Sequence, residues 1–409
     1  MHGHARFLLS AFLISFNFIL NAQPAYVFHD KGVEKLDAKN YVEAIKDFDL
    51  ALQKDKNHAP SYCDKARAEA EIGKKEEALK NFEQAIKLKS DYAEAYYYRA
   101  LLYYKIKDDK AIDDFSKTIQ LSPKNADAYL KRGMCYFAKK QEQDALKDFN
   151  KAIELKCNNI DVYYLRGKLL AQKGNTSDAL LDFNEVIKNN PTHSEALLQR
   201  GKIYLTQKKF EAALKDLNAC VANRLSTEEI YATRAACYMQ MGKLDDALKD
   251  YATLIDIFKT KDIEVYFMRA NANFKKNDLA AALKDCNKML ALNRESAAAY
   301  LLRGKIYLQQ GKSKYTPAMN DFKKVCELEP KNIEAWSKRG DLLFKTAKYN
   351  EAIEALNTCI ELKSDAEFYY TRSKCYYKTN NKKACCADLQ KASDMGNREA
   401  KKDLGVVCI

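Results

Sequence analysis

Apolar and small residues recur along this chain at spacings that fit one face of an α-helix. In a typical copy, the aromatic Tyr129 is followed four positions later by Gly133 and three positions after that by Tyr136. Sixteen residues downstream of the first aromatic, Ala145 is followed four positions later by Phe149. Spacings of three and four place such residues on one helical face. The pattern therefore predicts pairs of amphipathic helices.

These helix pairs repeat with steps of 33 to 36 residues, which gives eleven units within 25–396. The first helices are expected to begin at residues 25, 59, 93, 126, 160, 194, 228, 263, 297, 333 and 366. A hairpin of two helices cannot bury its apolar face alone, so such units must stack on one another. In the last segment, 397–409, residues Arg398 to Leu404 are expected to form a capping helix with charges on its outer side.

These residues resemble the tetratricopeptide repeat, whose pattern is an aromatic, a small residue four on, an aromatic three later, and Ala-x-x-x-Phe in a second helix. The resemblance covers Ala25 to about Asn397. It implies an all-α fold, a right-handed α-solenoid superhelix of about eleven repeats with a C-terminal capping helix. The departures are local: Asn273 and Cys286 replace the helix aromatics of the eighth unit, and Cys385 replaces alanine in the eleventh.

A second regularity pairs arginine with aspartate. Arginine stands at position 7 of nine units, directly before the small contact residue, and aspartate precedes the aromatic position of the second helix in nine. Both sit beside the helix contact, so we predict an Arg–Asp pair linking the two helices of most units. The alternative is a row of ligand-binding arginines.

The first 22 residues differ from the rest of the chain. Arg6 is their only charged residue, and an almost unbroken apolar run extends from Phe7 to Leu20 before the chain turns polar at Gln23. This is the pattern of a secretory signal peptide, so we expect a mature chain that begins at Gln23 and is periplasmic or secreted. The alternative is an uncleaved membrane anchor, although the run is short for a span. No later stretch is long and apolar enough to cross a membrane.

The chain has a formal net charge of +13, or +12 once Arg6 is removed with the signal. Such a charge is compatible with a nucleic acid or an anionic surface as partner. Acidic residues at position 2 of most units interrupt any continuous basic track, and no nucleic-acid partner is expected. They are Glu94, Asp127, Asp161, Glu195, Glu229, Glu264, Glu334 and Glu367.

No catalytic constellation is recognisable. Gly311-Lys312-Ser313 is similar to the end of a phosphate-binding loop, but Ile306 stands where the motif requires glycine. His29, His58 and His193 are isolated in the sequence, and common hydrolase and metal motifs are missing. The sequence thus predicts a protein that is not an enzyme, with no catalytic residue, metal site or cofactor.

The 12 cysteines conflict with the prediction of export, because oxidising compartments favour paired cysteines. Many occupy repeat core positions, where they are expected to act as small apolar residues. Two pairs, Cys220 with Cys237 and Cys359 with Cys375, join positions of neighbouring helices and could be disulfides. The adjacent Cys385 and Cys386 are a weaker candidate for a metal or redox site.

The resemblance implies that the first helices line a concave face, with ligands at positions 2, 5, 6, 9, 12 and 13. The early units place an aromatic and apolar stretch there, and later units add lysines; some of the tyrosines could instead pack between units. The candidate partner-binding residues are Tyr97, Tyr98, Leu101, Tyr104, Leu130, Met134, Phe137, Tyr164 and Leu165, then Lys305, Lys338, Lys345, Lys374 and Lys378.

We therefore expect an exported adaptor that holds a protein or peptide with apolar anchors and acidic residues in this groove. Binding of chaperone C-termini is disfavoured, because position 5 is almost always apolar or aromatic rather than lysine. The alternative function is a polyanion-binding or envelope-tethering protein that uses the lysines of the later units.

Overall fold

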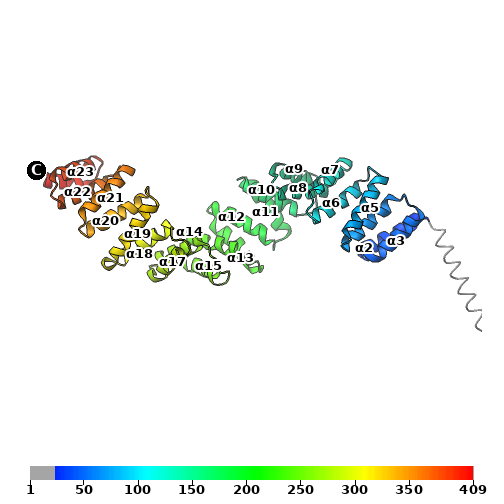
Figure 1. Cartoon of the computed structure of the whole chain (residues 1–409), viewed down its shortest axis with the longest axis horizontal. Coiled ribbons are helices and arrows are strands. Elements are labelled where there is room, and N and C mark those ends of the chain that lie inside the picture. Colours follow the sequence, from blue (N-terminus) through cyan, green and yellow to red (C-terminus); the bar gives the residue numbers. More distant parts are fainter. Residues whose placement is uncertain (1–23, 409) are drawn as a thin grey trace, which may run out of the picture. The chain divides into compact units, whose positions relative to one another are not determined.

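The computed structural model describes residues 24–408, and all regular structure in this part of the chain is helical. The predicted signal peptide, 1–22, lies outside the described residues. The chain divides into two units, and the boundary lies between Ile203 and Tyr204 in the sequence. Figure 1 shows the helices following one another in chain order within each unit. No helix in the described range is both long and apolar enough to span a membrane.

The first unit contains the opening helix pairs. Its helices are α2 (Ala25–Asp37), α3 (Tyr41–Lys54), α4 (Ala59–Glu71), α5 (Lys75–Leu88), α6 (Ala93–Lys105), α7 (Lys110–Leu121), α8 (Ala126–Ala138), α9 (Glu142–Glu154), α10 (Asp161–Gln172), α11 (Thr176–Asn189) and α12 (Ser194–Thr206), whose last turn crosses the boundary. Each first helix packs against the second helix that follows it, from α2 with α3 to α10 with α11.

The second unit continues the same alternation. Its elements are α13 (Phe210–Ala222), α14 (Glu228–Gln240), α15 (Leu244–Asp256), α16 (Ile263–Lys275), α17 (Leu279–Leu292), α18 (Ala297–Gln309), the 3₁₀ turn η1 (Lys312–Lys314), α19 (Tyr315–Leu328), α20 (Ile333–Lys345), α21 (Tyr349–Leu362), α22 (Ala366–Lys378), α23 (Lys382–Asp394) and α24 (Arg398–Val407). The first helices of the eleven repeats begin within one residue of the expected positions. The all-α fold of consecutive helix pairs is confirmed.

A left-handed residue ends the first helix of each repeat. Lys140, with φ +59°, and Gly174, with φ +80°, occupy this turn in the fourth and fifth repeats. In the first repeat the N–H of Asn40 donates to the carbonyl of Lys35, one residue after the left-handed Lys39. This is the Schellman arrangement, which satisfies carbonyls at a helix end. It reverses the chain so that the second helix returns along the first.

The core lies where the two helices of a pair meet. A β-carbon on Gly133 would lie 2.8 Å from Phe149 Cε1, and one on Gly304 would lie 2.8 Å from Phe322 Cε1. Small residues are therefore required on the first helix because phenylalanine rings of the second helix fill the space beside it. The fully buried phenylalanines are Phe48, Phe82, Phe115, Phe149, Phe183 and Phe322.

The predicted Arg–Asp pairs are present. In the fifth repeat Arg166 Nε and Nη2 donate to the two carboxylate oxygens of Asp182 at 2.9 and 2.6 Å. The same two-point contact occurs at Arg99–Asp114, Arg132–Asp148, Arg234–Asp250, Arg269–Asp285, Arg303–Asp321 and Arg372–Asp388. The third guanidinium nitrogen also reaches the preceding repeat, since Arg166 Nη1 donates to Asn150 at 2.8 Å. Each of these seven arginines thus joins two helices of its own repeat and, in several repeats, the one before.

The cap differs from expectation in its cysteines. Cys237, Cys359 and Cys375 carry free thiols, so neither of the two pairs that could have been disulfides forms one. The disulfide instead joins Cys386 of α23 to Cys408 just after α24, with the two Cα atoms 5.7 Å apart. Sequence spacing could not reveal this pair, because the return path of α24 along α23 sets the separation. The bond holds the capping helix, whose Ala400 is buried against the last repeat.

Candidate functional site

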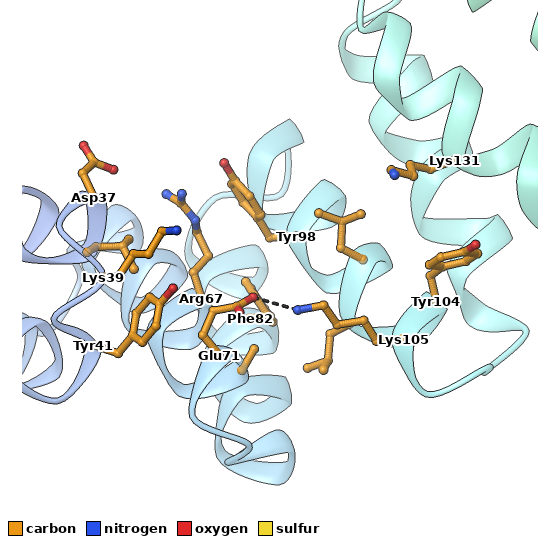
Figure 2. Close-up of a pocket in the computed structure, with 14 residues that line it drawn as sticks. Asp37, Lys39, Tyr41, Arg67, Glu71, Phe82, Tyr98, Tyr104, Lys105 and Lys131 are labelled. Carbon is orange, nitrogen blue, oxygen red and sulfur yellow. Dashed lines mark hydrogen bonds and ion pairs between the residues drawn. The ribbon is translucent and has the colours of Figure 1, made fainter. Parts of the chain in front are cut away.

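The first helices of the first four repeats line one hollow of about 480 Å³. Successive first helices contact one another in this region, α2 with α4, α4 with α6, and α6 with α8. Their outward positions therefore form a continuous surface. Figure 2 shows its side chains, which are Leu36, Asp37, Lys39, Tyr41, Arg67, Ala70, Glu71, Phe82, Tyr98, Leu101, Leu102, Tyr104, Lys105 and Lys131. Three of the predicted groove residues, Tyr98, Leu101 and Tyr104, are among them.

A cation–π stack forms one wall of the hollow. The guanidinium carbon of Arg67 lies 4.0 Å from the centroid of the Tyr98 ring, and Arg67 Nη1 donates to Asp64 at 2.6 Å. Both side chains are half-buried, and burial raises the pKa of Tyr98 while the Arg67 charge lowers it. Asp64 positions the guanidinium and the guanidinium supports the ring, so Tyr98 presents a fixed aromatic surface.

Only some of the charged side chains at the rim of the hollow have an ion-pair partner. Lys105 forms an ion pair with Glu71 at 2.7 Å, drawn as the dashed line in Figure 2. The side chains of Lys39 and Lys131 form no hydrogen bond or ion pair with any residue of the range 24–408. The floor between them is apolar, with Leu36, Leu101 and other side chains of the lining. The hollow thus offers apolar contact flanked by unsatisfied positive charge.

A second hollow of about 590 Å³ begins on the other side of Tyr104. Ile112 and Cys135 supply apolar lining, and Lys139 forms an ion pair with Asp109 at 2.7 Å across its rim. Tyr104 and Lys105 belong to both hollows. Tyr104 therefore separates two neighbouring depressions on the same helices and can contact a segment that occupies either.

Other predicted groove residues have in-chain partners. The Tyr97 hydroxyl donates to Asp127 of the next repeat, and the ring centroids of Tyr164 and His193 lie 5.0 Å apart. Met134 and Phe137 are half-buried, and Lys168 Nζ lies 5.7 Å from the Phe137 ring centroid. These contacts tie neighbouring repeats together, which is the alternative role that the sequence left open for the tyrosines.

Leu130 was wrongly predicted to line the groove. Its side chain has no exposed surface and packs with Phe149, Val162 and Leu169 in the core. Position 5 of a repeat lies at the edge between the open face and the neighbouring repeat. Leu130 turns into the apolar interface, whereas Tyr97 and Tyr370 at equivalent positions donate their hydroxyl groups to Asp127 and Asp403.

The later lysines do not form a simple basic track. Lys305 forms an ion pair with Glu334 of the next repeat at 2.7 Å. Asp341 lies near Lys338, Lys345 and Lys374; burial raises the pKa of this carboxyl, and the lysines oppose the shift. Acidic groups therefore offset much of the positive charge on this face.

Two of these lysines border the cap. Lys374 Nζ lies 3.7 Å from the Tyr370 ring centroid. Lys374 and Lys378 also line a hollow of about 310 Å³ beside the capping helix, with Tyr377 and Val407.

The structure brings together two histidines that look isolated in the sequence. His29 and His58 have ring centroids 5.0 Å apart, and Ser61 Oγ lies 3.3 Å from His29 Nδ1 and 2.8 Å from His58 Nδ1. His29 Nε2 lies 3.7 Å from Asp64, and burial lowers the pKa of this imidazole against the opposing effect of Asp64. Ser61 is fully buried, so its hydroxyl cannot reach a substrate. The cluster joins the first two repeats.

No group of three or more potential metal-ligating side chains occurs among residues 24–408. Gly311-Lys312-Ser313, the fragment similar to a phosphate-binding loop, lies in the turn between α18 and α19 rather than after a strand. Sequence reasoning missed Arg67 and Lys131 in the hollow. Their positions in the repeat could have revealed them, because Arg67 stands at position 9 and Lys131 at position 6, and both positions belong to the expected ligand-facing set.

Comparisons with known proteins agree with the repeat family that the sequence resembles. Residues 21–214 match the family model of the tetratricopeptide repeat protein 21 N-terminal ARM repeat, and residues 206–400 match that of the ETO1 C-terminal domain. The chain is 31% identical to mouse (Mus musculus) DnaJ homolog subfamily C member 3 over 146 residues, which are 32% of this chain and 29% of that protein. It is 29% identical to the human (Homo sapiens) mitochondrial import receptor subunit TOM70 over 103 residues, 25% of this chain and 16% of that protein. The chain thus spans less than a third of the length of these relatives.

Among solved structures, a tetratricopeptide repeat protein from Parabacteroides merdae is 23% identical and has a TM-score of 0.42, with 61% of this chain and 98% of that chain covered. No enzyme family is indicated by the matches. The periodic helix pairs and the match of residues 21–214 to a tetratricopeptide repeat family model show that the chain belongs to the tetratricopeptide repeat proteins.

Proposed function

We propose that this chain is a protein-interaction scaffold that holds a segment of another protein in the hollow of its first four repeats. The observation that carries the proposal is the juxtaposition of Tyr98, Leu101 and Tyr104 in an uncovered depression of about 480 Å³. Fixed aromatic side chains supply large contact area at little entropic cost, which is why tyrosine and arginine dominate the energetics of protein interfaces.

The lining indicates the chemistry of the bound segment. An apolar side chain fits the floor formed by Leu36, Leu101 and Leu102, and an acidic residue beside it fits the unsatisfied Lys131. Glu71 and Lys105 satisfy each other, so they fix the shape of the rim and contribute less to charge recognition. The similarity to an import receptor subunit supports a role in holding another protein.

The proposal includes an exported location. Residues 1–22 have the pattern of a secretory signal, and a disulfide joins Cys386 to Cys408. Disulfides persist in oxidising compartments. The remaining thiols are compatible with such a compartment, because burial raises the pKa of Cys237 to about 11 and that of Cys359 to about 12, which disfavours the reactive thiolate. N-terminal sequencing of the exported fraction should begin at Gln23; a cytoplasmic chain that retains Met1 would contradict export.

Site-specific photo-crosslinking tests the hollow. A photoreactive amino acid at Tyr104 should crosslink to a defined partner, because this ring faces both hollows. The same probe at Leu181, which is 67% exposed on the second helix α11, should not. The double variant Tyr98→Ala, Tyr104→Ala should recover at least roughly tenfold less of that partner than Leu181→Ala does, since two aromatic anchors are lost. Equal recovery by the two variants would rule out the hollow as the binding site.

The polyanion alternative predicts a different response to salt. Binding of a polyanion releases counterions, so its affinity should fall steeply with the logarithm of salt concentration. A largely apolar contact should weaken only mildly. The ion pair of Lys305 with Glu334 and the position of Asp341 among three lysines favour the protein-binding proposal.

A further inference from the structure

The tenth repeat breaks the Arg–Asp pattern in a way that leaves an arginine without its carboxylate. Arg339 stands at the repeat position of Arg303 and Arg372, but the second helix offers Ala355 where those repeats have Asp321 and Asp388. The side chain of Arg339 forms no hydrogen bond or ion pair with any residue between 24 and 408. The tenth repeat therefore contains the arginine but lacks the aspartate that accepts its hydrogen bonds in other repeats.

The helix contact of the tenth repeat nevertheless resembles that of a repeat with an intact pair. A β-carbon on Gly340 would lie 3.8 Å from Ala355 Cβ, and in the fourth repeat the corresponding distance from Gly133 to Asp148 Cβ is 3.2 Å. Ala355 Cβ thus occupies the place from which a carboxylate would reach the guanidinium. The missing group is the carboxylate alone, and the helices that would present it are in position.

An aromatic stack holds Arg339 in the usual place. Its guanidinium carbon lies 5.4 Å from the centroid of the Trp336 ring, the same distance as from Arg303 to the Tyr300 ring in the ninth repeat. The indole is fixed in turn, because Trp336 Nε1 donates to the Pro330 carbonyl at 2.9 Å. Both Trp336 and Arg339 are only half-buried, so the stack is accessible from solvent. The guanidinium is therefore ordered in advance of any ligand.

The second acceptor of the pattern is also missing. Arg303 Nη1 donates to Asn287 of the preceding repeat at 2.9 Å, and the residue in that position before Arg339 is Lys323. Two positive side chains therefore stand where other repeats have a cation and an acceptor. The nearby acids pair with lysines rather than with Arg339. Glu327 pairs with Lys324 at 3.2 Å and with Lys323 at 4.0 Å, and Glu334 pairs with Lys305 at 2.7 Å.

We infer that Arg339, stacked on Trp336, is a binding site for a carboxylate supplied by an acidic side chain of a partner protein. The seven intact pairs show that an arginine in this setting takes a carboxylate through two parallel hydrogen bonds, a geometry that favours a planar carboxylate. The site belongs to the tenth repeat and is independent of the hollow in the first four repeats. Its test does not require that hollow to bind anything.

Trp336 provides a direct readout, because it is the only tryptophan of the chain. An Asp-rich peptide without aromatic residues, titrated into the full-length protein, should change the selectively excited tryptophan emission in a saturable way. The matched peptide with asparagine in place of aspartate should leave it unchanged, and inorganic phosphate should act more weakly than the Asp-rich peptide. An equal response to the asparagine peptide, or a stronger response to phosphate, would overturn the carboxylate assignment.

The variant Ala355→Asp tests the site from inside the chain. Its new carboxylate should pair with Arg339, as Asp321 pairs with Arg303, and should weaken the response to the Asp-rich peptide at least roughly tenfold. A melting temperature no lower than that of the wild type would show that the variant folds. The variant Arg339→Lys, which keeps the charge but loses the two-point geometry, should also weaken the response. An unaltered titration in both variants would contradict the proposal.

Discussion

The layer between paired helices and the hollow of the first four repeats use basic side chains in opposite ways. In the layer, Arg166 has two hydrogen bonds to Asp182, whose side chain is only 3% exposed. In the hollow, Tyr98 and Lys131 face outward from first helices, and Lys131 has no ion pair within the described range. The comparison teaches that a carboxylate partner within the chain, rather than the positive charge itself, separates a structural cation such as Arg166 from one that is open to a partner, such as Lys131.

The largest effect on stability is expected from Arg166→Met. The substitution leaves Asp182 buried without its cation, and removing one partner of such a pair costs about 2–4 kcal/mol after allowance for the partly exposed guanidinium. Urea unfolding should show a lower midpoint, while partner recovery should be unchanged. A variant that unfolds normally but loses the partner would assign Arg166 to the binding surface instead.

A smaller effect is expected from Gly133→Ala, compared with Gly340→Ala. The new methyl group at 133 would lie 2.8 Å from Phe149 Cε1, whereas at 340 its nearest neighbour is Leu356 Cγ at 3.3 Å. Overpacking against a buried ring should cost about 1–3 kcal/mol, and the aliphatic neighbour at 340 should yield more easily. Thermal melts of the two variants measure the difference, and equal melting temperatures would contradict the steric account of the small contact residue.

The smallest effect is expected from Asp341→Asn, and it should depend on pH. Burial raises the pKa of Asp341 in the folded protein, so its ionised form destabilises the fold at neutral pH. The variant should therefore be slightly more stable than the wild type there. This advantage should shrink as the pH falls through the raised pKa and vanish below the ordinary range of aspartate. Melts across this pH range check the sign, and an advantage that grows in acid would contradict it.

Much of the fold follows from the sequence because the repeat constrains it. Tyr129, Gly133 and Phe149 fix the register of a helix pair, and eleven copies in phase leave little freedom in where helices begin. The Arg–Asp pairs were also predictable, since both partners recur in step. The burial of Leu130 was not, because it depends on how far a side chain at position 5 turns toward the neighbouring repeat.

The disulfide and the unpaired arginine illustrate two different limits. Cys408 follows the final helix, and only the path of α24 brings it to Cys386. Arg339 was visible in the sequence as an arginine with Ala355 in the aspartate register, but its significance required the intact pairs as a reference. Departures from a repeat become informative once the role of the regular residue is known.

The most direct measurement of the central distinction is partner recovery plotted against melting temperature for matched variants. Arg166→Met should lower the melting temperature and retain the partner, and the Tyr98→Ala, Tyr104→Ala variant should retain its melting temperature within a few degrees and lose the partner. If both variants lose the partner only in proportion to their loss of stability, the hollow has no binding role of its own and the account is wrong.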